Sequence, residues 1–500
     1  MLQLSSTVEL KLHRSDLRSD VTFSESILGD GVYFTAGQSY LKLKKFPYPQ
    51  IITEISTSAK NFGYDFGNGE VFSIEVISGK CFVRTPGFGQ VQLFYLCSDE
   101  WLLAADSFAG LVSMVQPLYQ LELDPDGVID WLLLQPNLAQ QTIIKYIYKL
   151  PENSQLQWSG GSWDVAAVQS LEEQVIPFAS LNTAHMQTEF EEHLHTQIST
   201  VASISQSNSW SSCLSGGVDS AVVTTLVSQV LPTQALAISA EPAAVRVQQQ
   251  AVLQSLVQKL PVSLGHVSAA EIPLLEDLDE LLLADPYLDP YANWSIALAQ
   301  HCHVLHNKVV FTGIGGDDFY ARHQTATPAQ HSADMLSSRF IASRFTARTK
   351  QQLAKTSILP ASLSDALLFY HVPWMLCGVW PVSPFASAGS ISFSLYLKNA
   401  HKQKKQFLQD FIQAKTGLTF PQWQHKFSLS PVFYAAVIAI TPSFSCANLH
   451  QALRNLAIFE YEEIETVLQQ IREHHQVNKQ DMRQLFQLYK LNRFLQILDL

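Results

Sequence analysis

Charged residues are scarce in this chain of 500 residues. They make up 15% of it, whereas about a quarter is typical of globular proteins. Apolar residues reach 47%, so the disordered and highly solvated classes, which are charge-rich and apolar-poor, are excluded. The net charge of −12 argues against bulk electrostatic binding to nucleic acid or anionic lipid. The length predicts several domains, because one domain usually takes ~100–200 residues.

Close cysteine pairs are absent. No two cysteines form a C-x-x-C pair, which excludes zinc ribbons and thioredoxin-like sites. We expect buried free thiols in a reducing compartment. The six cysteines are Cys81, Cys97, Cys213, Cys302, Cys377 and Cys446.

Segments that would direct the chain to a membrane are also lacking. Glu9 and Lys11 interrupt the apolar N-terminus, so we expect no signal peptide. Two stretches without charged residues, 366–397 and 427–453, contain prolines and lack the ~18 clean apolar residues of a membrane span. We therefore expect a soluble, cytoplasmic protein with no membrane span.

The first ~150 residues have the texture of an antiparallel β structure. Half of the 22 glycines lie before residue 130, and short runs with strand character lie between them. A three-residue connection, 98–100, separates two of these runs and predicts a hairpin. The predicted strands are 8–12, 71–77, 91–97 and 101–105.

After Gly160 and Gly161 the pattern changes to alternating strands and helices. Such alternation predicts βαβ units and a mostly parallel sheet. The predicted strands are 210–214, 235–239 and 309–312, and the predicted helices are 189–201, 221–231, 247–260 and 294–305. The last 45 residues predict two helices with a break near residues 477–478.

A glycine-rich loop, 215–220, connects the first of these strands to its helix. It reads Ser215-Gly216-Gly217-Val218-Asp219-Ser220. Its glycines let backbone N–H groups turn toward a phosphate, and the helix N-terminus adds donors and a positive dipole end. Ser215 and Ser220 supply hydroxyl donors, and Asp219 is placed to hold Mg²⁺ beside the phosphates. The sequence contains no Walker A motif.

A second loop follows the predicted strand 309–312. It reads Gly313-Ile314-Gly315-Gly316-Asp317-Asp318. In a doubly wound sheet the loops at the carboxyl ends of neighbouring strands meet at one crevice. We therefore expect Asp219 and Asp317 to share a metal ion, with phosphate oxygens completing its ligands.

Taken together, the two loops resemble the asparagine synthetase family of PP-loop ATP pyrophosphatases. Members carry S-G-G-x-D-S and, about a hundred residues later, G-E-G-[SA]-D-E; Pro384-Phe385 resembles a later P-F-L-D segment. Residues 102–108, and more loosely 117–119, resemble two runs of the family's glutaminase domain.

The resemblance implies two domains. Residues 1–175 would be a degenerate, β-rich Ntn-glutaminase-like domain. Residues 176–500 would be a PP-loop, adenine nucleotide alpha hydrolase-like synthetase domain, with a doubly wound parallel sheet and a helical C-terminus.

Two departures from the family pattern bear on the activity. Glutaminase members carry a nucleophilic cysteine directly after the initiator methionine, where this sequence has Leu2, so glutamine hydrolysis by that mechanism is not expected. Ile314 stands where asparagine synthetases carry Glu and β-lactam synthetases carry Tyr. Isoleucine performs neither polar role, which disfavours both activities.

The sequence is most similar to lasso peptide cyclases, which show the form G-x-G-G-D-[DE] at the second loop. The resemblance implies an ATP- and Mg²⁺-dependent macrolactam synthetase acting on a precursor peptide beside a leader peptidase. It would adenylate an internal Asp or Glu side chain and join it to the peptide's own α-amine, releasing AMP and pyrophosphate.

The expected residue roles follow from these motifs. Asp219 and Asp317 would hold the metal, and Asp318 would orient the carboxylate of Asp317. Lys426, which stands without the arginine of the family's R-x-K, would stabilise developing negative charge. ATP and pyrophosphate would be bound by Ser215, Gly216, Gly217, Asp219, Ser220, Gly313 and Gly315.

Two alternatives remain open at this stage. One is an asparagine synthetase-like or β-lactam synthetase-like amide ligase acting on a small molecule. The other is an inactive PP-loop scaffold that binds a partner. Residues 366–387 are either a wall of the peptide pocket or ordinary core.

Overall fold

The computed structural model describes most of the chain between Val8 and Leu498. Outside the described part lie residues 1–7, 18–22, 29–30, 45–49, 56–58, 67–70, 88–90, 134–139, 169–184, 206, 240–242, 276–277, 285, 288–289, 322–337, 343–366, 368–369, 371, 398, 420–429, 474–476 and 499–500. The predicted boundary between residues 175 and 176 falls within one of these stretches.

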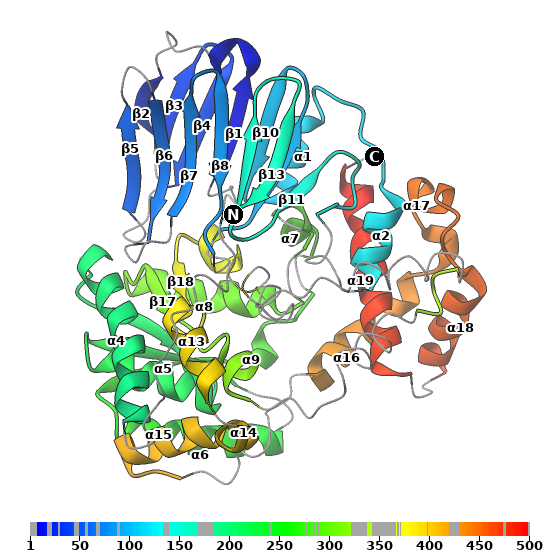
Figure 1. Ribbon diagram of the computed structural model, residues 1–500. Coiled ribbons are helices and arrows are strands. Elements are labelled where there is room, and N and C mark those ends of the chain that lie inside the picture. Colours follow the sequence, from blue (N-terminus) through cyan, green and yellow to red (C-terminus); the bar gives the residue numbers. More distant parts are fainter. Residues whose placement is uncertain are drawn as a thin grey trace.

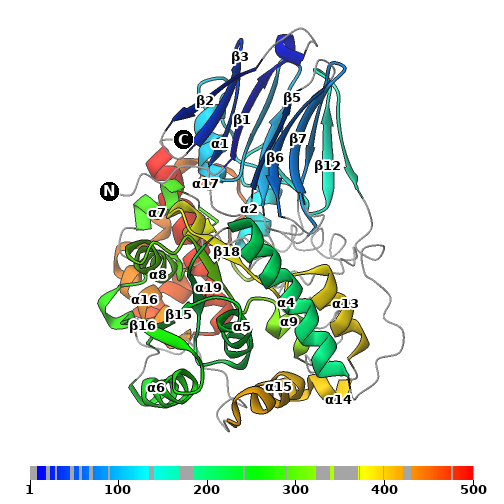
Figure 2. The ribbon, with the colours of Figure 1, turned by 90° about the vertical axis from the view of Figure 1, so that its left-hand side faces the viewer.

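Two antiparallel sheets form the N-terminal region, and Figure 2 shows them as separate layers. The first sheet has the order β11 (Tyr148–Leu150), β9 (Leu93–Cys97), β10 (Trp101–Ala105), β1 (Val8–His13), β4 (Ser39–Lys44), β3 (Gly31–Ala36), β2 (Ser24–Leu28). The second has the order β13 (Trp163–Ala167), β12 (Ser154–Trp158), β8 (Lys80–Arg84), β7 (Val71–Ile77), β6 (Ala59–Asp65), β5 (Gln50–Ile55).

Alternation of side chains explains how the two sheets pack. Val8, Leu10 and Leu12 are buried along β1 while the residues between them are partly exposed. Because successive side chains point to opposite faces of a strand, these three residues face the second sheet and share one core with Phe62. The rings of Phe34 and Phe62, from opposite sheets, lie with centroids 4.5 Å apart.

Helices cover the outer face of the first sheet (Figure 1). Leu103 on β10 packs in one core with α1 (Phe108–Val115), α2 (Pro125–Leu132) and the C-terminal helices. The indole N–H of Trp131 donates to the carbonyl of Gln487 (3.1 Å), which ties α2 to the last helix. The C-terminal elements are α16 (Ser430–Ile440), α17 (Gln451–Asn455), α18 (Tyr461–Arg472) and α19 (Lys479–Leu498).

A five-stranded parallel sheet forms the second region. Its order is β16 (Val262–Val267), β15 (Thr233–Ile238), β14 (Trp210–Cys213), β17 (Val309–Phe311), β18 (Trp380–Val382). The strand order reverses beside β14, and the crevice at such a point is where ligands bind in open α/β sheets. The helices that follow or flank its strands are α4 (Met186–Ser205), α5 (Val218–Ser228), α6 (Ala243–Val257), α7 (Leu278–Ala284), α8 (Ala292–Val304), α9 (Gly316–Tyr320), α13 (Ala388–Tyr396), α14 (Asn399–Lys402) and α15 (Gln406–Thr416).

Both faces of the parallel sheet are buried. On β17, Val309 and Phe311 point into the core shared with α4, α5 and α15, whereas Val310 points into the core shared with α8. Strands that are covered on both faces read as continuous apolar runs, which is how this short strand appears in the sequence.

The two regions meet along β4, β6 and the chain before β18. The buried ammonium of Lys44 donates to the carbonyls of Met375 and Leu376, both at 3.4 Å. The ring of Tyr64 lies 5.9 Å from that of Trp380. The described residues of the segment 366–387, Trp374 among them, are therefore largely core. Within the described part of the chain, no helix is long and apolar enough to cross a bilayer.

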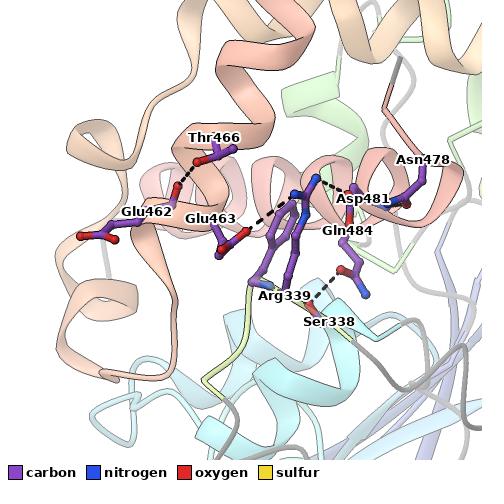
Figure 3. A network of polar contacts seen from close by, with 9 residues as sticks. Ser338, Arg339, Glu462, Glu463, Thr466, Asn478, Asp481 and Gln484 are labelled. Atoms are coloured by element: carbon purple, nitrogen blue, oxygen red, sulfur yellow. Dashed lines mark hydrogen bonds and ion pairs between the residues drawn. The ribbon is translucent and has the colours of Figure 1, made fainter. Parts of the chain in front are cut away.

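A short segment, 338–342, is clamped onto the C-terminal helices (Figure 3). The guanidinium of Arg339 pairs with Asp481 and lies 3.7 Å from the carboxylate of Glu463. The hydroxyl of Ser338 donates to Gln484 (2.9 Å), and Ile341 forms a β-bridge with Phe459. This segment thus joins the chain beyond α9 to α18 and α19.

The predicted elements are found at or near their expected positions. The predicted hairpin is the pair β9–β10, and the break between the last two helices lies between Arg472 and Lys479. Several helix boundaries were wrong by a few residues, as for α4 and α6. The one that matters at the sheet edge is the start of α5, which begins at Val218 rather than residue 221, with Gly217 as its N-cap. Asp219 and Ser220 therefore belong to the first turn of the helix rather than to a preceding loop.

Candidate active site

Three connections meet at the carboxyl end of the parallel sheet. Residues 214–217 follow β14, residues 312–315 follow β17, and residues 383–387 follow β18. The hydroxyls of Thr312 and Ser383 lie 2.6 Å apart, so a hydrogen bond joins the second and third connections. A single edge of the sheet therefore gathers the motifs that lie up to 170 residues apart in the sequence.

The first connection, which opens α5, is closed by hydrogen bonds of its own serines. The Ser220 hydroxyl donates to the carbonyl of Gly217 (2.9 Å) and accepts from the N–H of Ser215 (3.2 Å). The amide of buried Gln249, on α6, donates to the carbonyls of Ser215 (2.8 Å) and Ile238 (3.0 Å). These bonds fix the turn that places Gly216, with φ of +86°, before the N-terminus of α5.

Glycines let the second connection touch the first. A Cβ on Gly313 would lie 2.8 Å from the backbone nitrogen of Ser220, and a Cβ on Gly316 would lie 2.4 Å from the carboxyl carbon of Asp219. Real Cβ atoms do not approach that closely, so these two positions require glycine. Asp317 follows directly in α9, which brings the carboxylates of Asp219 and Asp317 to one place.

Lys405 joins these two carboxylates. Its ammonium pairs with Asp219 and lies 2.6 Å from the carboxylate oxygen of Asp317. The side chains of Lys405 and Asp219 are 16% and 17% exposed, whereas that of Asp317 is 44% exposed. Burial by itself lowers the pKa of Lys405, but the two carboxylates raise it above its ordinary value. The site thus holds two carboxylates and one charged ammonium.

An aromatic cluster holds this lysine in place. Phe407 and Phe411 on α15, directly after Lys405, pack around Phe190 of α4 with ring centroids 5.1 Å away in both cases. Tyr320, three residues after Asp317, stacks on Phe407 at 6.4 Å and lies 2.8 Å from the hydroxyl of Ser390. Lys405, at the start of α15, and Asp317, on α9, are therefore held by helices that pack closely against each other.

Several other predicted residues lie in this neighbourhood. Gly315, with φ of +95°, precedes α9 and packs against Phe385. Asp318 lies in the first turn of α9 and is partly exposed. Ile314 is partly buried and packs against the main core. Lys426 lies outside the described residues.

Two residues of the site went unpredicted. Lys405 belongs to a basic cluster, 402–405, in a chain otherwise poor in charge, and that local density was the available signal. Gln249 carried no signal, because a glutamine in an amphipathic helix is ordinary. Both act through contacts with residues far away in the sequence.

The segment 102–108, for which the sequence suggested a glutaminase resemblance, makes structural contacts. Residues 102–105 lie in strand β10 and are buried. The carboxylate of Asp106 accepts from the N–H of Val8 (3.1 Å), and the Ser107 hydroxyl caps α1 by accepting from the N–H of Gly110 (3.2 Å). Burial raises the pKa of all six cysteine thiols above the ordinary value.

The two carboxylates at the sheet edge suit a divalent cation that prefers oxygen ligands and takes its remaining ligands from water and substrate. Gly316 allows the carboxylate of Asp219 to lie against the backbone beside Asp317. Two carboxylates, completed by water and substrate phosphate, are a usual set for Mg²⁺. Among the residues that the structure describes, no group of three or more His, Cys, Asp or Glu side chains converges as a self-sufficient metal site.

Comparison with known proteins identifies one family. Residues 198–417 match the asparagine synthase family model. The match covers less than half of the chain, but it contains the five parallel strands, the connections 214–217 and 312–315, and Lys405. No curated protein matches the chain. The match supports the asparagine synthetase family, whose members are ATP-dependent amide-forming ligases.

Proposed function

We propose that this protein is an AMP-forming ligase that closes an isopeptide ring within a precursor peptide, the activity of a lasso peptide cyclase. The proposal rests on the single edge of the parallel sheet where Asp219, Asp317 and the N-terminus of α5 meet. The asparagine synthase match over the same residues supports ATP-dependent amide formation there.

The first chemical step makes the carboxylate a better acylating group. An oxygen of the peptide's Asp or Glu side chain attacks the α-phosphorus of ATP, the bond between the α-phosphorus and the bridging oxygen breaks, and pyrophosphate leaves. Ser215, Gly216, Gly217, Ser220, Gly313 and Gly315 would bind the nucleotide and the departing pyrophosphate. The positive end of α5 favours these anions at its N-terminus.

Asp219 and Asp317 would hold Mg²⁺, which neutralises negative charge on the leaving pyrophosphate. Asp318, which follows Asp317 in α9, would orient the carboxylate of Asp317. Lys426 would stabilise charge developing in the transition state.

The second step is intramolecular. The nitrogen of the peptide's own α-amine attacks the activated acyl carbon, the C–O bond to AMP breaks, and the amine loses one proton. Because both reacting groups belong to one molecule, the protein contributes mainly by positioning them, an effect worth up to ~7–11 kcal/mol.

The cysteines favour an amine that does not come from glutamine. A glutaminase needs a reactive thiolate, whereas burial raises the pKa of every cysteine of this chain. None of the six cysteines forms a disulfide, which supports a reducing, cytoplasmic location. We expect a leader peptidase to act beside the enzyme, because the α-amine must be freed before it can attack.

The test follows peptide mass and nucleotide together. The protein is incubated with ATP, Mg²⁺ and a leader-trimmed peptide that bears an internal Asp or Glu, with and without a leader peptidase. A peptide that loses one water while AMP accumulates supports the proposal. Formation of ADP, or AMP without any cyclised peptide across a panel of candidate precursors, contradicts it.

A second candidate is favoured by the family match itself. An ammonia-dependent, asparagine synthetase-like ligase would use the same nucleotide site on a small carboxylate. Incubation with aspartate, ammonium and ATP distinguishes the two, because only this candidate yields asparagine and AMP in the absence of peptide.

A further inference from the structure

Lys405 reaches the carboxylate pair from an unusual stretch of backbone. Lys404 and Lys405 both adopt left-handed conformations, with φ of 50° and 57°, at the junction between the 3₁₀ turn 403–405 and α15. This region is disfavoured for residues that carry a side chain, so the surrounding packing must hold it. The result is that the ammonium of Lys405 points at Asp219 and Asp317, while Lys404 remains exposed.

The position of this ammonium conflicts with a metal on the same carboxylates. An ammonium that contacts both carboxylates takes the place between them that a bridging divalent cation would need. The three groups together carry a net charge of −1, so the carboxylates are already largely neutralised. A cation must therefore displace Lys405 rather than bind beside it.

We propose that Lys405 is an internal counterion that holds the Asp219–Asp317 pair in the nucleotide-free enzyme and makes divalent-cation binding depend on the triphosphate. The proposal rests on the proposed function in one respect, since it takes these two carboxylates as the metal ligands.

Cation binding would depend on the triphosphate because a displaced Lys405 ammonium needs a new partner. Phe407 and Phe411 anchor α15, so a displaced ammonium stays close to the site and needs another anion. Among the described residues, Asp219 and Asp317 are the carboxylates that raise the pKa of Lys405, and displacing a mostly buried ammonium from them without a replacement anion is costly. A triphosphate at the N-terminus of α5 brings that anion, because this helix end favours negative charge.

Coupling of this kind is reciprocal. If the triphosphate strengthens cation binding by some factor, the cation must strengthen triphosphate binding by the same factor. Lys405 thereby disfavours binding of the cation alone or the triphosphate alone, since each binds well only when the other is present.

The experiment measures cation affinity without any turnover. Mn²⁺ replaces Mg²⁺ and is titrated into the full-length protein, and free Mn²⁺ is read from its electron paramagnetic resonance signal. The wild type and Lys405→Met are compared without nucleotide. A parallel titration measures how much Mn²⁺ strengthens binding of an ATP analogue with a methylene group between the α- and β-phosphorus atoms.

We expect Lys405→Met to bind Mn²⁺ at least tenfold more tightly than the wild type in the absence of nucleotide. The factor by which Mn²⁺ strengthens binding of the ATP analogue should fall correspondingly. Adding Asp317→Asn to Lys405→Met should abolish the gain, which assigns the binding to this carboxylate pair. Lys404→Met is the matched control, because it removes the same charge one residue away from the same backbone region; it should behave as the wild type.

Equal Mn²⁺ affinities for the wild type and Lys405→Met overturn the proposal, as does an equal gain in Lys404→Met. Thermal melting checks that the variants fold, and Lys405→Gln, which keeps a polar end, replaces Lys405→Met if that variant does not. The titration is independent of catalysis, so tight Mn²⁺ binding by the variant in a protein that never forms AMP would sustain this proposal and refute the proposed function.

Discussion

Two stretches of this protein, 102–108 in the N-terminal region and 215–220 in the parallel-sheet region, differ in what their side chains contact. The first supplies a buried strand, a backbone anchor at Asp106 and a helix cap at Ser107. The second opens α5 at the edge of the parallel sheet and delivers Asp219 to a site with Asp317 and Lys405. What each stretch can do therefore depends on which groups the fold brings around it.

The two regions also differ in the surroundings of a buried carboxylate. Asp130 on α2 is buried near Asp126 and Asp124, and burial followed by these neighbours raises its pKa to about 7. Asp219, also largely buried, lies against the ammonium of Lys405. Asp130 is thus held toward its neutral form by burial and by like charges, whereas Asp219 has an ammonium as its ion-pair partner.

The largest expected effect comes from removing either site carboxylate. Asp219→Asn or Asp317→Asn should lower AMP formation at least about 10³-fold, because each removes charge that the nucleotide site needs. The rate is measured by separating AMP from ATP in the cyclisation assay. Asp164→Asn, on the exposed strand β13, is the control and should retain the wild-type rate. A site variant that keeps full turnover would refute the shared role of these carboxylates.

The next effect concerns the aromatic cluster beneath the site. Phe190→Ala should lower the free energy of unfolding by about 3–5 kcal/mol, because Phe190 is buried among five aromatic rings. Denaturant unfolding measures the loss.

Phe62→Ala, in the core between the two antiparallel sheets, is the matched comparison. It should be destabilised to a similar degree while the folded molecules keep their rate of AMP formation. Folded Phe190→Ala should also be slower, since its cavity loosens α15 and Lys405. Equal rates in the two variants would show that the packing of α15 does not position the site.

A smaller effect is the pH dependence of stability that Asp130 introduces. Its pKa is 3.8 in the unfolded reference and about 7 in the folded protein, so the folded state binds more protons between these values. Stability from this group must then fall as the pH rises from about 4 to about 7. Asp130→Asn should remove this fall and stabilise the protein by about 2–4 kcal/mol at pH 8, with little change at pH 4. Thermal melting at both values tests the sign, and a loss of stability at pH 8 would contradict it.

The smallest expected effects compare one serine from each of the two stretches, 102–108 and 215–220. Ser107→Ala should cost about 1 kcal/mol, because it removes the N-cap of α1, and should leave AMP formation unchanged. Ser215→Ala, at the mostly exposed start of the second motif, should reduce AMP formation more than stability. If Ser107→Ala slowed the reaction in proportion to its loss of stability, the N-terminal region would have a part in the chemistry.

Much of the fold was predictable, because its signals are local. The hairpin at residues 98–100 follows from two apolar runs around a short polar turn, and β17 follows from its apolar run. The start of α5 was misplaced by three residues, since its N-cap, Gly217, makes no side-chain cap hydrogen bond and lacks the side-chain oxygen that marks most N-caps in a sequence. Lys426 remains a prediction, and the domain boundary does too.

The sequence by itself determined that two glycine-rich acidic loops follow two strands of one parallel sheet, because strand, turn and helix signals depend on neighbouring residues. The tertiary structure alone decided what the acidic residues meet. Lys405 lies 186 positions after Asp219 in the chain, and its ammonium reaches the site only because Phe190, Phe407 and Tyr320 pack three helices together. Contacts between residues so distant depend on how whole elements pack, which no short window of sequence encodes.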